Sequence, residues 1–187
     1  MTTEGSARSS GTPTRLPLFV CHANCARSVL AYYLYRHLTG APALSAGLEA
    51  GTVISDKVEP MLSRWGIDAA NHRATQLTRE LCLSATHVFL MGPNYIRRVM
   101  VEYGDDLLDR SYLFADPFSR PLSFARGEYR VTDPSFDSRS LTERIREWSW
   151  MRERVLQIRL ALLGEGPTLI AASAYSALLG DLDPLGH

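Results

Sequence analysis

The chain has 187 residues, 45% of them hydrophobic, which suits one folded domain with short tails and excludes a wholly disordered protein. Its formal net charge of +0 argues against a nucleic-acid partner, because surfaces that bind nucleic acids carry an excess of Lys and Arg. No apolar run reaches the roughly 20 residues needed to cross a bilayer, so we expect no membrane partner either.

Residues 1–15 predict a flexible tail, since they are rich in Ser, Thr and Gly. They lack the apolar segment of a signal peptide, which predicts a cytoplasmic protein. In that compartment the three cysteines are expected to stay reduced. An odd, small number of cysteines in such a protein raises the question of a catalytic thiol.

The rest of the chain alternates short apolar runs with helical segments. Residues 117–134 are expected to be irregular because they contain three prolines. In chain order the sequence predicts a strand at Leu16–Val20, a helix at Val29–Leu38, a strand at Ala43–Ala46, a helix from Ser55 to Trp65, a short helix from Thr78 to Leu83, a strand at Thr86–Met91, a helix at Asn94–Tyr103, a strand at Ser111–Ala115 and a long helix at Ser138–Leu163.

Capping residues mark the ends of several of these helices. Ser28, Ser55 and Thr78 are predicted N-caps, because their hydroxyl groups can accept a hydrogen bond from the first turn. Gly40 and Gly66 are predicted to end the helices that precede them. The buried stripe of the long helix is expected to include Leu141, Ile145, Trp148, Val155 and Leu156.

Strands that alternate with helices are typical of a parallel sheet covered on both faces. We therefore expect a three-layer, doubly wound α/β fold with a central parallel four-stranded sheet flanked by helices. Right-handed crossovers would bring the carboxyl ends of the strands to one edge, where such folds bind ligands. Residues 16–163 are expected to form this domain, and residues 164–187 a C-terminal extension that is either a docking helix or a loose tail.

The central motif is the loop Cys21–Ser28, a Cys-x5-Arg-Ser pattern between an apolar strand and a helix. At such a place the backbone N–H groups and a helix N-terminus can converge on an anion. Together with the forked guanidinium of Arg27, these N–H groups would hold the three oxygens of a phosphoryl group.

The same positive surroundings would stabilise the thiolate of Cys21, which could then attack phosphorus and form a thiophosphate intermediate. Ser28 is placed to donate a hydrogen bond to the sulfur as it departs. The alternative is a structural cysteine that ends a buried strand. The coincidence of the loop, Arg27 and Ser28 favours the catalytic interpretation.

These residues resemble the active-site loop of the low-molecular-weight protein tyrosine phosphatase family, whose Cys, Asn, Arg and Ser correspond to Cys21, Asn24, Arg27 and Ser28. The resemblance extends over residues 16–163 and implies a phosphatase domain that needs neither a cofactor nor a metal. Its further motifs, in order, are Ser45-Ala46-Gly47, Gly66-Ile67, His72-Arg73-Ala74, Gln76-Leu77, the strand Val88–Met91 and Asp133-Pro134.

The resemblance also implies roles for single residues. Cys21 would be the nucleophile, Arg27 the cation that holds the phosphate, and Asp133 the general acid. Asp116 competes for the last role, because it begins the same Asp-Pro dipeptide. The phosphate-binding loop would comprise His22, Ala23, Asn24, Cys25, Ala26 and Ser28, the network that supports Asn24 would comprise Ser45 and His72, and the mouth of the site would be lined by Phe136 and His22.

The loop departs from the family pattern where Ala23 replaces a Gly, Ala26 replaces the second Cys, and Val29 replaces a Pro. Cys25 stands one position before the family's second cysteine. Two interpretations of Cys25 stay open: a reversible disulfide with Cys21, or a small residue that lines the pocket.

The leading functional expectation is hydrolysis of protein phosphotyrosine through a cysteinyl phosphate. Three alternatives stay open: a phosphatase for phosphoarginine or a small phosphorylated metabolite, an arsenate reductase, and a phosphate-binding regulator without turnover. Arsenate reduction needs further relay cysteines, and Cys82 is the only distant one.

A metal site is not expected. Cys21 and Cys25 have a Cys-x3-Cys spacing, but His72, Cys82 and His87 are scattered and complete no four-ligand set. The expected partner is a phosphorylated protein or small molecule, and the oligomeric state stays open.

Overall fold

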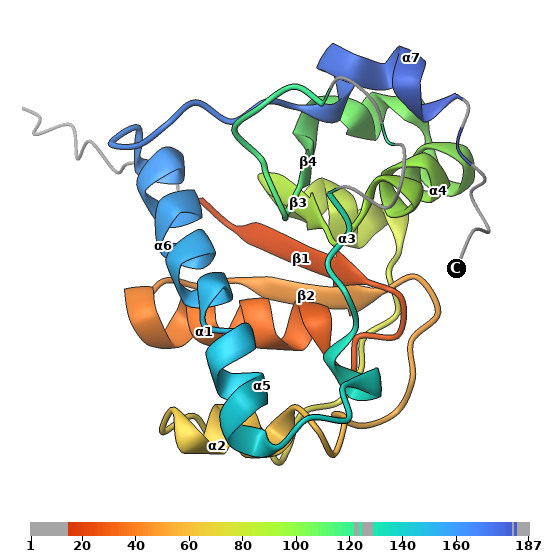
Figure 1. Cartoon of the computed structure of the whole chain (residues 1–187). Helices are drawn as coiled ribbons and strands as arrows, with labels where there is room; N and C mark the ends of the chain where they lie inside the picture. The colour runs from red at the N-terminus through yellow and green to blue at the C-terminus, as the bar shows by residue number, and fades with distance from the viewer. Residues whose placement is uncertain (1–14, 122–123, 125–128, 181, 183–187) are drawn as a thin grey trace, which may run out of the picture.

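The computed structural model describes residues 15–121, 124, 129–180 and 182, so the tail predicted for residues 1–15 lies, apart from Arg15, outside the described residues. Its centre is a four-stranded sheet in the order β2-β1-β3-β4, and every neighbouring pair is parallel (Figure 1). The expected α/β fold is confirmed. The strands are β1 Pro17–Cys21, β2 Leu44–Gly47, β3 His87–Leu90 and β4 Ser111–Leu113.

Helices cover both faces of this sheet. The main ones are α1 Arg27–Thr39, α2 Glu59–Arg64, α3 Arg79–Ser84, α4 Pro93–Tyr103, α5 Leu141–Glu147 and α6 Trp150–Leu163. The chain moves from β1 to β2 in one direction and from β3 to β4 in the other, so right-handed crossovers put α1 and α4 on opposite faces. Accordingly, α1 packs on β1 and β2 and against α6, whereas α4 packs on β3 and β4.

Strand β1 is buried along its whole length because every residue in it is apolar and both of its edges are paired. Phe19 anchors the core, with ring centroids 5.7 Å from Phe89 and 5.9 Å from Phe114. Cys21 is the last residue of the strand and pairs in register with Gly47. The predicted nucleophile therefore lies at the carboxyl edge of the sheet.

The first helix begins earlier than expected, because the backbone is already helical at Arg27 and Leu30 N donates to Ala26 O at 2.9 Å. The N-cap is Ala26, and the prediction that Ser28 caps the helix is wrong. Ser28 lies inside the first turn, where its hydroxyl group is available to the preceding loop. The predicted end is confirmed, since Gly40 adopts φ 65°.

Two further predictions about helix starts have different outcomes. Helix α2 begins only at Glu59, because the Ser55 hydroxyl accepts a hydrogen bond from Lys57 N in a local turn instead of capping the helix. Thr78 does cap α3, since its side chain accepts from Leu81 N.

The long helix predicted for residues 138–163 is two helices, α5 and α6, because Trp148 ends the first one and Ser149 begins the second. Helix α5 starts with a capping box between Ser140 and Glu143. Leu156 is 42% exposed, so the prediction that it is buried is wrong. The buried residues of α6 are Met151, Val155, Ile158 and Leu162.

The segment after α6 packs back onto the domain. It forms a 3₁₀ turn, η4 Ala172–Tyr175, and the short helix α7 Ser176–Leu179. Tyr175 and Leu179 are buried, and Ile170 N donates to Pro117 O at 2.8 Å. In Figure 1 this blue segment lies beside β4 and α4. Residues 170–179 therefore pack against the domain, as the docking alternative predicted.

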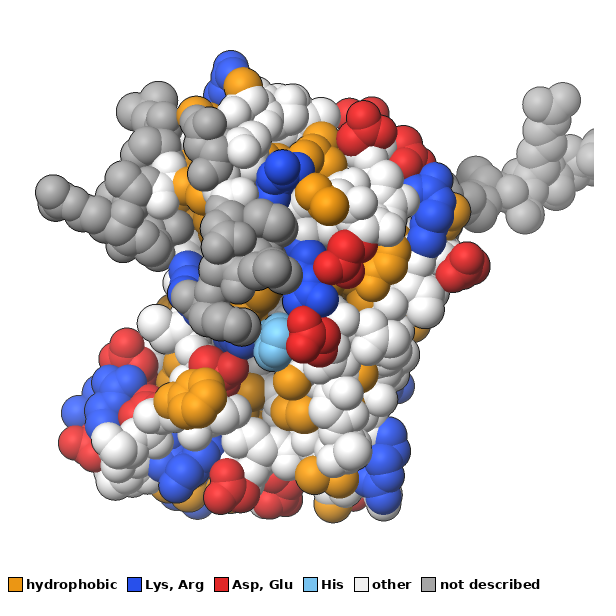
Figure 2. Space-filling model, turned by 90° about the vertical axis from the view of Figure 1, so that its right-hand side faces the viewer, with side chains coloured by type: hydrophobic (Ala, Val, Ile, Leu, Met, Phe, Trp, Pro, Cys, Tyr) orange, Lys and Arg blue, Asp and Glu red, His pale blue; other side chains and the backbone are white. Residues whose placement is uncertain are grey.

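Within the described part of the chain, no helix is both long enough and apolar enough to span a bilayer. On the face drawn in Figure 2, acidic and basic side chains are interspersed, and hydrophobic side chains occur in small groups between them. This mixture agrees with the balanced net charge of the sequence.

Candidate active site

The loop between β1 and α1 turns its carbonyl oxygens outward. In a planar trans peptide the N–H and C=O groups point in opposite directions, so the N–H groups of residues 22–26 face the inside of the loop, beside Cys21. Such convergent N–H groups bind anions. The outward hydrogen bonds run from Leu48 N to Cys21 O (3.1 Å), Glu49 N to His22 O (2.9 Å), Gly51 N to Ala23 O (2.9 Å), His72 Nε2 to Asn24 O (2.9 Å) and Ser55 N to Cys25 O (2.9 Å).

Asn24 is the turning point of the loop and adopts a left-handed φ of 53°, which Asn tolerates better than most residues. Its side chain is fully buried and satisfied at both ends. Nδ2 donates to Ser28 Oγ at 2.9 Å, and Oδ1 accepts from Thr75 N at 2.9 Å. Ala23 stays in the ordinary φ range, so the replacement of the family's Gly causes no strain there.

The network predicted around Asn24 includes His72 but differs at Ser45. Ser45 lies in β2 opposite Phe19, and none of the hydrogen bonds described for Asn24 goes to it. The main-chain N–H of Thr75 supports the Asn24 side chain instead, by donating to its Oδ1. Residues 75–77 reach the loop because they run beside the end of β2, where Gly47 N donates to Thr75 O at 2.9 Å.

Cys21 and Ser28 face each other across the loop, with Sγ and Oγ 3.0 Å apart. Both residues are buried, at 2% and 0% exposure. Since Ser28 Oγ already accepts a hydrogen bond from Asn24, its own proton is free to point at the sulfur. This is the arrangement needed to stabilise a thiolate that acts as a leaving group.

Gly47 allows the loop to approach β2 closely. A Cβ atom at this position would lie 2.6 Å from His22 O and 2.8 Å from Asn24 N. Backbone atoms cannot give way as a flexible side chain can, so any larger residue would displace the loop. The Gly of the Ser-Ala-Gly motif is therefore a packing requirement of the anion site.

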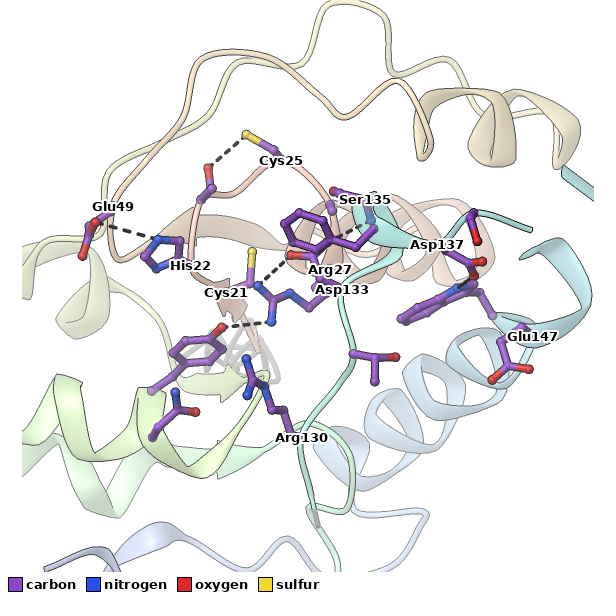
Figure 3. A pocket seen from close by; sticks show the side chains of 18 of the residues that line it. Cys21, His22, Cys25, Arg27, Glu49, Arg130, Asp133, Ser135, Asp137 and Glu147 are labelled. Carbon is purple, nitrogen blue, oxygen red and sulfur yellow. Dashed lines mark hydrogen bonds and ion pairs between the residues drawn. The ribbon is translucent and has the colours of Figure 1, made fainter. Parts of the chain in front are cut away.

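Arg27 is held over the pocket by three residues, one from α4 and two from the stretch that precedes α5. Its Nη1 donates to Tyr95 OH at 2.9 Å and to Val131 O at 3.4 Å, while Nη2 lies 2.9 Å from Asp133 Oδ2. Burial alone lowers the pKa of Arg27, but the negative charge of ionised Cys21, followed by those of Tyr95 and Asp133, raises it above the ordinary value. Arg27 is thus a fixed cation beside the sulfur (Figure 3).

Of the two Asp-Pro candidates, Asp133 lies at this site. It is the N-cap of the 3₁₀ turn η3 Pro134–Phe136, and its Oδ1 accepts from Ser135 N at 3.0 Å. Asp116 instead closes a turn of its own with Ser119 and Phe118, and it does not line the pocket.

Cys25 is directed away from the nucleophile. Its Sγ donates to Ala23 O at 3.2 Å and lies over Gly51, where a Cβ atom would come within 2.6 Å of it. Figure 3 shows the two sulfurs pointing in different directions. Burial, followed by the charge of ionised Cys21, raises the pKa of Cys25 above the ordinary value. This geometry favours the pocket-lining interpretation over a disulfide with Cys21.

The mouth of the pocket is lined on one side by His22, whose Nε2 lies 3.8 Å from Glu49 Oε2, and on the other by Phe136. The Phe136 side chain is 88% exposed, so its ring is open to contact at this mouth. It can cover an aromatic group placed over Cys21.

Several residues of the site carry no signal in the sequence. Tyr95 and Thr75 contact Arg27 and Asn24 from segments 68 and 51 residues away. Trp148 was expected only as a residue of the long helix, yet it lines the pocket and donates to Asp137 Oδ2 at 3.4 Å. Arg130 also lines the pocket, from the segment before Asp133.

The remaining cysteine lies away from this site. Cys82 is fully buried in α3, and burial raises its pKa to about 11. Within the described residues, no three His, Cys, Asp or Glu side chains come together in a way that could hold a metal ion.

Comparisons with known proteins agree with this geometry. One relative is a "probable low molecular weight protein-tyrosine-phosphatase EpsP" from Ralstonia solanacearum, 34% identical over 89 residues. That match covers 46% of this chain and 61% of the relative, so the chain spans less than two thirds of the relative's length.

Solved structures share the fold. The YwlE arginine phosphatase from Geobacillus stearothermophilus has a TM-score of 0.65 and 26% identity, over 81% of this chain and 94% of that one. The tyrosine phosphatase Wzb from Escherichia coli K30, solved in complex with sulphate, has a TM-score of 0.65 and 16% identity, over 80% and 99% of the two chains. A family model described as low molecular weight phosphotyrosine protein phosphatase matches residues 17–155. The chain therefore belongs to the low molecular weight phosphotyrosine protein phosphatase family.

Proposed function

We propose that this protein hydrolyses phosphomonoesters, with protein phosphotyrosine as its main substrate, through a cysteinyl phosphate on Cys21. One observation carries the proposal: the Cys21 sulfur, the Arg27 guanidinium and the Asp133 carboxylate line one pocket, with inward-facing N–H groups at its base. This set can bind a phosphoryl group, attack it and protonate the group that leaves.

In the first step, the loop N–H groups and Arg27 hold the three terminal oxygens of the phosphate. The Cys21 thiolate attacks phosphorus, so that an S–P bond forms while the bond from phosphorus to the ester oxygen breaks. The incoming phosphate releases Asp133 from Arg27, and the freed carboxylate takes up a proton from the phosphate monoanion or from solvent. The resulting carboxylic acid gives this proton to the departing oxygen. A neutral alcohol or phenol leaves, and the phosphoryl group stays on sulfur.

In the second step, water attacks phosphorus on the side that the alcohol vacated. The Asp133 carboxylate takes a proton from this water, a P–O bond forms, and the S–P bond breaks. The sulfur leaves as a thiolate, stabilised by the Ser28 hydroxyl 3.0 Å away. Inorganic phosphate is released, Asp133 loses its proton as it pairs with Arg27 again, and the site returns to its starting state without a cofactor or metal.

Phosphotyrosine is favoured as the substrate by the exposed ring of Phe136 at the mouth, which can stack on an aromatic leaving group. The relative EpsP is described as a probable protein-tyrosine-phosphatase, which supports the same substrate class, protein phosphotyrosine. A thiolate nucleophile suits the reducing cytoplasm, where we place the reaction.

Phosphoarginine is the second candidate substrate, because the YwlE structure that shares this fold is that of an arginine phosphatase. Arsenate reduction is disfavoured, since it would need Cys82 as a relay thiol. That side chain is fully buried, and its pKa of about 11 keeps it protonated near neutral pH.

The test is phosphate release from p-nitrophenyl phosphate, from a phosphotyrosine peptide and from a phosphoarginine peptide. We expect the wild type to turn over the first two, and Cys21→Ser to lose this activity while it stays folded. Cys82→Ala, which changes a cysteine outside the pocket, is the matched control and should remain active. A folded wild type that releases no phosphate from any of the three substrates between pH 5 and pH 8 would contradict the proposal, as would an active Cys21→Ser variant.

A further inference from the structure

Arg130 is an arginine of the pocket wall without a hydrogen bond or ion pair to any described residue. It is also exposed, so its charge is available at the pocket opening. Three other arginines line the same pocket, and all of them are paired: Arg27 with Asp133, Arg98 with Glu49 and Glu102, and Arg139 with Asp137 and Glu147.

The backbone of the next residue fixes the place of Arg130. Val131 N donates to Met91 O at 2.8 Å at the end of β3, and Val131 O accepts from Arg27 at 3.4 Å. The aliphatic stem of Arg130 passes over Gly92, with its Cγ 3.6 Å from where a Cβ atom of that glycine would stand. Figure 3 shows the side chain reaching up toward the centre formed by Cys21 and Arg27.

We infer that Arg130 forms a subsite for a carboxylate of the substrate, supplied by an Asp or Glu next to the phosphotyrosine. The inference rests on the proposed phosphatase function and adds a preference in peptide sequence to it. The phosphate itself has its own donors in the loop N–H groups and Arg27, so the charge of Arg130 is left for a neighbouring anion. Because the wall on this side also holds Asn94 and Tyr95, the subsite is polar and suits a short acidic side chain.

An exposed ion pair of this kind has a modest effect. Pairs between exposed groups change binding by up to about fivefold, and salt screens them. We therefore expect kcat/KM to be about two- to fivefold higher for phosphotyrosine peptides with a flanking Glu than for matched peptides with a flanking Lys. The preference should shrink as ionic strength rises.

The experiment measures kcat/KM for three phosphotyrosine peptides that differ only in the residues beside the phosphotyrosine: Glu, Gln or Lys. The quantity compared is the kcat/KM for the Glu peptide divided by the kcat/KM for the Lys peptide, called the Glu-to-Lys ratio. In Arg130→Gln this ratio should fall to about one. In Arg130→Glu it should fall below one. Arg120→Gln is the matched control, since Arg120 is exposed and does not line the pocket. It should keep the wild-type ratio.

The outcomes separate this inference from the function on which it rests. If the wild type is active but all variants keep the same Glu-to-Lys ratio, the subsite is disproved and the phosphatase function stands. If Arg130→Gln loses activity equally for all three peptides, Arg130 binds the phosphate itself, and the inference is again overturned. If the wild type releases no phosphate from any peptide or from p-nitrophenyl phosphate, the proposed function fails.

Discussion

Asp133 and Arg27 form an ion pair, with Oδ2 and Nη2 2.9 Å apart, across the pocket where we propose that phosphate binds. The carboxylate occupies a donor of Arg27 that a phosphate oxygen would need. Binding of an oxyanion by Arg27 therefore requires this ion pair to separate. Once separated, the Asp133 carboxyl group is available to the leaving group. The ion pair links the binding of phosphate to the delivery of the acid.

The first prediction concerns this ion pair. Asp133→Asn should lower kcat for p-nitrophenyl phosphate by about 10²- to 10⁴-fold, because the proton donor is lost. The same variant should bind inorganic phosphate at least as tightly as the wild type, since Arg27 no longer has a competing carboxylate. Steady-state kinetics with phosphate as a competitive inhibitor measure both quantities. Asp116→Asn is the control, and a comparable loss of kcat in that variant would mean that the acid has been misassigned.

A second prediction concerns Tyr95 as a positioning residue for Arg27. Tyr95→Phe removes the hydroxyl that accepts from Nη1 and should lower kcat/KM by about 10- to 100-fold, the range for a hydrogen bond to a charged group. The inhibition constant for phosphate should rise in parallel, whereas the shape of the pH profile should not change. Tyr32→Phe removes a hydroxyl from an exposed pair with Arg36 and serves as the control. An unchanged inhibition constant in Tyr95→Phe would argue against the positioning role.

The third prediction tests the close approach of Gly47 to the loop. Gly47→Ala should destabilise the protein by about 1–3 kcal/mol and abolish most of the activity, because its Cβ atom would press on the backbone of His22 and Asn24. Gly180→Ala is the matched control, since that glycine has φ −60° and room for a Cβ atom. Urea denaturation and phosphatase assays report on the two effects. Equal behaviour of the two variants would contradict the packing argument.

The fourth prediction concerns oxidation of the loop. Because the Cys25 sulfur bonds Ala23 O and its pKa is raised, it should stay protonated near neutral pH and react slowly with iodoacetamide. Wild type and Cys25→Ser should then lose activity at the same rate in hydrogen peroxide. Mass spectrometry of digested, oxidised protein offers the decisive check, since a peptide pair linked through Cys21 and Cys25 would show that the loop rearranges to form the disulfide.

The fifth prediction concerns acid stability. Burial, followed by the charges of Arg15 and Arg110, lowers the pKa of His87 from 6.5 to about 4. Between these values the unfolded chain binds a proton that the folded protein does not, so the free energy of unfolding should fall as the pH drops through this window. In His87→Gln, the free energy of unfolding measured by urea titration should decrease less between pH 6.5 and pH 4 than it does in the wild type. An identical decrease in both proteins would show that other groups account for it.

Local signals in the sequence were enough for much of the fold. The apolar run that ends in Cys21 predicted β1, and the alternation of strands and helices predicted the parallel sheet. Thr78 and Gly40 predicted helix ends correctly, because their capping contacts are made with neighbouring residues. Ser28 carries the same kind of local signal but does not cap a helix, because its hydroxyl group contacts the loop. The break at Trp148 was missed, since the buried positions Trp148, Met151 and Val155 keep the spacing of one continuous helix across it.

The sequence by itself determined the chemical groups of the site: the order Cys, Asn, Arg and Ser is local, and it places a sulfur and a cation on one short loop. Only the tertiary structure decided which distant groups hold them. Asp133 rather than Asp116 reaches Arg27, and Tyr95, from the helix after β3, fixes its guanidinium. The physical reason is that these contacts depend on how the strand ends meet at one edge of the sheet, and no pattern within a few residues encodes that meeting.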